Sequence, residues 1–161
     1  MELDDWSELF VATAGAAAAL AGLIIVAMSV NIETIVSERS LPSRAGATIA
    51  SLVLVVVVAV AGLIPGIGTG GMGWVTLVFS LAALGFAIDS AVRLARLPDQ
   101  LAVVRLVKGA VLIVPILSFV AGALILVAGL DAGLYFVAAG MLLAFVSSVL
   151  NAWVLLVEIR R

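Results

Sequence analysis

All eight lysine and arginine residues of this 161-residue chain fall into three short stretches, which follow the first, third and fifth of five long apolar runs. Basic residues concentrate in the cytoplasmic loops of membrane proteins. The arrangement therefore predicts five transmembrane helices, with the N-terminus outside and the C-terminus in the cytoplasm. The basic residues are Arg39 and Arg44, then Arg93, Arg96, Arg105 and Lys108, and finally Arg160 and Arg161.

The composition supports a membrane protein. Hydrophobic residues make up 65% of the chain and charged residues only 11%, which leaves too little polar surface to cover a water-soluble globule. Five spans of about 20 residues each use up nearly the whole sequence. We therefore expect one membrane domain, residues 1–161, folded as an all-α polytopic helix bundle. The expected helices cover residues 9–32, 47–64, 74–91, 109–130 and 134–157.

Proline and glycine predict where these helices are interrupted. Pro42 disfavours helix in the first basic loop, and Pro65 ends the second helix. The glycine-rich segment 66–73 is expected to form the turn into the third helix. Pro115 lies inside the fourth helix, where a kink is expected and where neighbouring helices must satisfy the freed carbonyl.

The residue types that are missing exclude many kinds of chemistry. The chain has no cysteine and no histidine, which rules out disulfides, thiol nucleophiles, imidazole bases and the common zinc and haem sites. Asp89 is the only acidic residue inside an expected span, and it has no second carboxylate nearby for acid–base catalysis or metal binding. We expect no enzymatic activity, no cofactor and no bound metal. Because the basic residues mark membrane boundaries, we also expect no nucleic-acid partner.

Polar residues at membrane depth are the candidates for function, because placing them there costs free energy. Asp89 precedes Arg93 by four residues, so the two can form an ion pair at the end of the third helix; a proton or cation site is the alternative. Asn151 shares a helix face with Ser147. That face predicts helix packing with an interhelical hydrogen bond from Asn151, and a solute-lining role is the alternative.

Further polar groups end the first helix at the same expected level, namely Asn31 and Glu33. If all of these groups converge, they form a polar vestibule that opens toward the cytoplasm. The candidate vestibule residues are Asn31, Glu33, Asp89, Arg93, Ser147 and Asn151.

The first helix also carries a block of alanine and glycine. Ala14, Ala18 and Gly22 follow each other at intervals of four residues, a spacing of small residues that lets membrane helices approach closely. We expect a helix-packing face there. The sequence leaves open whether this face packs within the chain or against another copy or protein.

The same region carries a resemblance to a known group of proteins. Its residues are Phe10, Gly15, Leu20-Ala21-Gly22-Leu23, Ser29 and Asn31-Ile32-Glu33, followed by Leu41-Pro42 and Arg44-Ala45. This first quarter of the chain resembles the opening of a group of small, uncharacterised polytopic membrane proteins of bacteria. Some members are labelled as modulators of a membrane-bound protease. The resemblance implies a location in the bacterial inner membrane.

Two hypotheses for function follow. In the first, the chain is a non-enzymatic accessory or interaction subunit in the lipid bilayer, and it docks on itself or on a larger membrane complex through small-residue helix faces. In the second, it forms a homo-oligomeric channel or small transporter that uses the polar vestibule.

Overall fold

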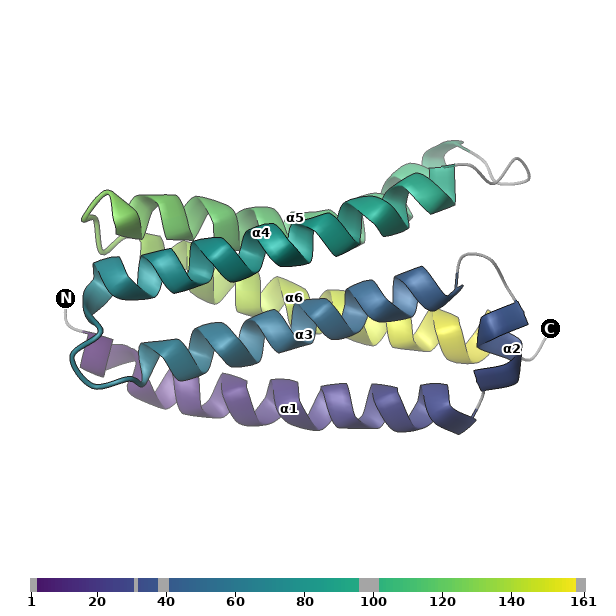
Figure 1. Cartoon of the computed structure of the whole chain (residues 1–161), viewed down its shortest axis with the longest axis horizontal. Coiled ribbons are helices and arrows are strands. Elements are labelled where there is room, and N and C mark those ends of the chain that lie inside the picture. The colour runs from purple at the N-terminus through teal and green to yellow at the C-terminus, as the bar shows by residue number, and fades with distance from the viewer. Residues whose placement is uncertain (1–2, 31, 38–40, 96–101, 159–161) are drawn as a thin grey trace.

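The computed structural model describes residues 3–30, 32–37, 41–95 and 102–158. These parts of the chain are almost entirely helical and contain no strand. The long helices are α1 (Ser7–Val30), α3 (Leu41–Gly62), α4 (Gly68–Ala95), α5 (Ala102–Val127) and α6 (Gly133–Glu158) (Figure 1). A 3-10 turn, η1 (Leu3–Trp6), precedes α1, and the short helix α2 (Ile32–Ser37) follows it.

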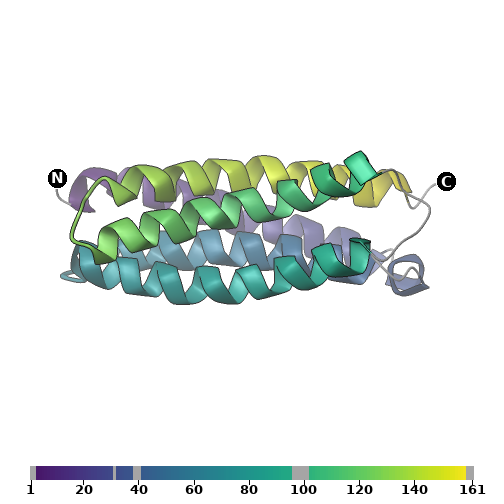
Figure 2. The ribbon, with the colours of Figure 1, turned by 90° about the horizontal axis from the view of Figure 1, so that it is seen from above.

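The five long helices lie side by side along one axis (Figures 1 and 2). Each is long and apolar enough to cross a membrane, which confirms the expected all-α bundle with five candidate spans. The start of η1 and the end of α6 lie at opposite ends of the bundle (Figure 1). We call these the N-terminal end, which holds the α3–α4 and α5–α6 turns, and the C-terminal end, which holds α2.

The expectation that Pro42 keeps the first loop from being helical is wrong. Helix α3 begins at Leu41 and contains Pro42 in its first turn. The first N–H groups of a helix have no partner within it, so a proline there removes no hydrogen bond, and its fixed φ angle suits the helix.

The expected glycine-rich turn is also shorter than predicted. Helix α4 already starts at Gly68, so only residues 63–67 connect it to α3. Gly66 has a φ angle of 75° in this connection, a conformation that glycine adopts without steric cost. Gly73 serves helix packing instead, because a Cβ there would lie 3.0 Å from the backbone nitrogen of Val127 in α5.

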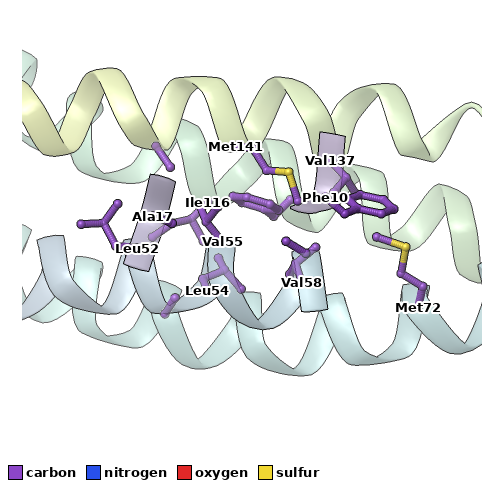
Figure 3. Packing of buried hydrophobic residues seen from close by; sticks show 14 of the residues in the cluster. Phe10, Ala17, Leu52, Leu54, Val55, Val58, Met72, Ile116, Val137 and Met141 are labelled. Atoms are coloured by element: carbon purple, nitrogen blue, oxygen red, sulfur yellow. The ribbon is translucent and has the colours of Figure 1, made fainter. Parts of the chain in front are cut away.

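Helix α3 is central to the packing. It contacts α1, α4 and α6, whereas α5 packs mainly between α4 and α6. The core between these helices is filled by side chains such as Phe10, Val55, Val58, Met72 and Met141 (Figure 3). In contrast, α1 packs mainly against α3 and lies at the edge of the bundle.

Aromatic contacts fix the N-terminal end of α1. The ring of Phe10 is 1% exposed and lies over Gly62, where a Cβ would come within 2.5 Å of the ring. Trp6 meets Tyr135 of α6 edge to face, with ring centroids 5.1 Å apart, a favoured aromatic geometry. These contacts set the rotation of α1 and so decide which of its faces points outward.

Candidate functional site

The structure places the six candidate vestibule residues in different surroundings. Glu33 and Asp89 are exposed, whereas Ser147 and Asn151 are 6% and 4% exposed. Asn31 and the side chain of Arg93 lie outside the described residues, and with them the expected pair of Arg93 with Asp89. Of the six, the structure brings together Ser147 and Asn151.

Ser147 of α6 bonds to a backbone carbonyl of α5 that lies one helical turn before Pro115. Its hydroxyl donates a 2.7 Å hydrogen bond to the backbone carbonyl of Val111. Val111 precedes Pro115 by four residues, and proline has no N–H to donate to that carbonyl. The serine of α6 therefore supplies the donor that α5 itself lacks, and α5 continues as a single helix through Pro115.

Asn151 lies one helical turn beyond Ser147. Its Nδ2 lies 3.5 Å from the Ser147 Oγ, in a hydrogen bond within α6. The interhelical hydrogen bond from Asn151 remains a prediction, while Ser147 makes the interhelical contact described above. A further interhelical bond runs from Ser118 Oγ to the carbonyl of Phe136, at 2.8 Å.

The face of α6 that carries these residues is buried. Its small members let α5 approach closely: a Cβ on Gly140 would lie 3.0 Å from the ring of Phe119. The face consists of Gly140, Ala144, Ser147, Ser148 and Asn151, all of which are buried. The face packs inside the bundle, in agreement with its small and polar composition.

An apolar groove of about 250 Å³ lies between α5 and α6, next to the hydrogen bond from Ser147 to Val111. Pro115 and Ser147 line it together with exposed aliphatic side chains, including Val114 and Leu150. The polar hydroxyl of Ser147 is already bonded to α5. In a membrane this groove faces lipid tails.

The small-residue face of α1 points mostly away from the bundle. Ala14 is partly buried and packs against the core, but Ala18 and Gly22 are exposed. Gly15 and Ala19 are exposed on the same side. We call these four outward residues, Gly15, Ala18, Ala19 and Gly22, the α1 outer face.

The glycines of the α1 outer face differ from those inside the bundle. A Cβ on Gly15 or Gly22 would meet no atom within 4 Å. A Cβ on Gly133, at the start of α6, would lie 2.5 Å from the carbonyl oxygen of Gly122 in α5. Within the bundle, then, small residues bring helices into contact, whereas on α1 the same residue types are left uncovered.

A pocket that the sequence did not reveal lies at the N-terminal end. It has a volume of about 470 Å³, and its walls include Asp4, Ser7, Asp131 and the 63–67 connection. These walls come from three segments that are far apart in the chain, so no sequence motif could have indicated them. Within the described residues, no three acidic, cysteine or histidine side chains are grouped in a way that could hold a metal ion.

Comparison with protein-family models, with curated proteins and with solved structures finds no match for this chain.

Proposed function

We propose that the chain is a non-enzymatic integral membrane protein that acts as an accessory or interaction subunit. It sits in a bacterial inner membrane with its C-terminus in the cytoplasm. It docks through the α1 outer face, on a second copy or on a larger membrane protein.

The observation that carries this proposal is the uncovered state of the α1 outer face. Lipid tails are as apolar as leucine, so helices in a membrane associate through close packing and hydrogen bonds rather than through the hydrophobic effect. Small residues permit that close packing. Gly15 and Gly22 have open space around them, and they lie two helical turns apart on one side of α1.

Site-specific photo-cross-linking in intact membranes tests the proposal. A photoreactive benzoylphenylalanine at position 19 is expected to give adducts with protein, of defined mass. The matched control is the same residue at position 81, because Leu81 is 53% exposed on α4 and lies at a similar depth. Position 81 is expected to give only lipid adducts. Lipid adducts alone from position 19 would contradict the proposal.

The alternative is a homo-oligomeric channel or small transporter. Within one chain the structure brings together only Ser147 and Asn151 of the described candidate residues. This function therefore requires exposed groups such as Asp89 and Glu33 to line a space between copies. The substitution Asp89→Asn separates the two functions in a liposome flux assay. If the chain is a docking subunit, no flux is expected to depend on residue 89. The substitution is then expected to change the free energy of unfolding by no more than about 0.5 kcal/mol, because position 89 is exposed. A flux that changes with this substitution would favour the channel.

A further inference from the structure

Four hydroxyl groups inside the bundle have no hydrogen-bond partner among the described residues. They belong to Ser51, Thr76, Ser90 and Ser148, and each residue is at most 4% exposed. A buried hydroxyl without a partner costs free energy, and more so where no bulk water can reach it. Where two such hydroxyls lie at one level on neighbouring helices, a single ligand can satisfy both.

Two of these hydroxyls lie at one level of the bundle. Helices α3 and α6 pack against each other and run in opposite directions. Val58 of α3 and Met141 of α6 lie at neighbouring levels of the same core cluster (Figure 3). Ser51 is seven residues from Val58, and Ser148 is seven residues from Met141, both toward the C-terminal end. Seven residues are two helical turns, about 10 Å, which places Ser51 and Ser148 at the same level of the two packed helices.

A buried polar, uncharged residue lies about one helical turn from each serine of this pair. Thr48 is three residues from Ser51, Asn151 is three residues from Ser148, and both are buried. The same interface is apolar toward the N-terminal end, where Val58 and Met141 lie. A ligand at this place has to donate and accept hydrogen bonds and needs no charge.

We propose that Ser51 and Ser148 bind a water molecule that bridges α3 and α6. Water both donates and accepts, and a buried water makes two to four hydrogen bonds to polar groups of this kind. Ordered water also satisfies polar groups within membrane proteins. The bridge joins α6 to α3, the helix on which α1 is packed, and it is independent of docking at the α1 outer face.

The first test detects the water in the wild-type chain. Nuclear Overhauser spectroscopy in lipid nanodiscs is expected to show cross-peaks from a long-lived water to the β-protons of both Ser51 and Ser148. Cross-peaks to only one serine, or to neither, would overturn the proposal. This includes the case in which the two hydroxyls bond directly to each other.

The second test is a double-mutant cycle followed by unfolding in mixed detergent micelles. Ser51→Ala and Ser148→Ala are each expected to lower the folding equilibrium constant about three- to tenfold, which lies within the range measured for hydrogen bonds between membrane helices. The double variant is expected to lose no more than the larger single loss, because either change removes the bridge.

Thr76→Val is the matched control, because the Thr76 hydroxyl is also buried and unpartnered but lies in the N-terminal half of α4. This substitution is expected to leave the folding equilibrium constant unchanged or to raise it. Two outcomes would overturn the proposal. In one, the decreases in the folding equilibrium constant of the single variants multiply in the double variant Ser51→Ala/Ser148→Ala. In the other, neither single variant lowers the folding equilibrium constant.

Discussion

At the residue level, the hydroxyl of Ser147 in α6 donates a hydrogen bond to the carbonyl of Val111 in α5. Pro115 removes the helical donor for that carbonyl, and a carbonyl in hydrocarbon has no water to replace it. Ser147 therefore compensates for a defect that Pro115 creates in a different helix.

This dependence predicts a coupling between the two residues. Ser147→Ala is expected to lower the free energy of unfolding by about 1 kcal/mol in the wild-type chain. In a chain that also carries Pro115→Ala, the loss is expected to fall close to zero, because the new N–H at position 115 can donate to Val111. Unfolding of the four chains in mixed micelles measures both values.

Ser118 provides the control for this cycle. Its hydroxyl also crosses from α5 to α6, where it bonds to the carbonyl of Phe136, but no proline deprives that carbonyl of its helical donor. The cost of Ser118→Ala is therefore expected to be the same with or without Pro115→Ala. If the cost of Ser147→Ala is unaffected by Pro115→Ala, the compensation account fails.

At the level of elements, glycines decide how closely α5 and α6 approach. Gly122 and Gly133 face each other with backbone atoms so close that a Cβ on Gly133 would lie 2.5 Å from the Gly122 oxygen and 2.9 Å from the Leu126 nitrogen. Backbone cannot move aside as a flexible side chain can. These two helices therefore depend on glycine at their crossing.

Gly133→Ala is accordingly expected to lower the free energy of unfolding by about 1–3 kcal/mol, the usual cost of overpacking. Gly85→Ala is the control, since a Cβ at Gly85 meets nothing within 4 Å. It is expected to be neutral or to stabilise the helix by up to about 1 kcal/mol. Equal effects of the two substitutions would show that the α5–α6 contact is looser than described.

The elements were predictable to the extent that hydrophobicity determines them. Five apolar runs define five helices, and the structure contains all of them. The predictions for Pro42 and for the segment 68–73 are wrong because proline and glycine do not interrupt a helix at every position. A helix accepts proline in its first turn, and the packing of α4 on α5 at Gly73 favours helix in a glycine-rich segment.

The candidate site was predictable only in part, because a sequence does not give the rotation of each helix. The small and polar face of α6 could be identified from its spacing. The partner of Ser147 could not, since Val111 carries no polar side chain and the need for a donor arises from Pro115. Likewise, nothing local to Asp89 or Glu33 shows whether they point inward, and the structure has both exposed.

At the level of the whole molecule, charge is distributed unevenly between the two ends. The described part of the N-terminal end carries Asp4, Asp5, Glu8 and Asp131 and no basic residue. All eight basic residues of the sequence fall in the stretches 39–44, 93–108 and 160–161, which follow the first, third and fifth apolar runs. Under the positive-inside rule, this asymmetry favours a cytoplasmic C-terminal end.

Labelling of single cysteines tests that orientation, because the natural chain has no cysteine. Ala132→Cys, exposed at the N-terminal end, is expected to react with a membrane-impermeant maleimide added to intact cells. Val36→Cys lies in α2 at the other end, where Val36 is 67% exposed. It is expected to react only after the membrane is permeabilised, and the reverse pattern would contradict the orientation.

We propose that this molecule works as part of an assembly held through the α1 outer face. Native mass spectrometry of the protein, extracted from its own membranes in mild detergent, measures whether that assembly exists. The wild-type chain and Gly85→Leu are expected to form a defined complex, either of several copies or with another protein, and Gly22→Leu is expected to give an isolated chain. An isolated wild-type chain, or a complex that survives Gly22→Leu unchanged, would contradict it.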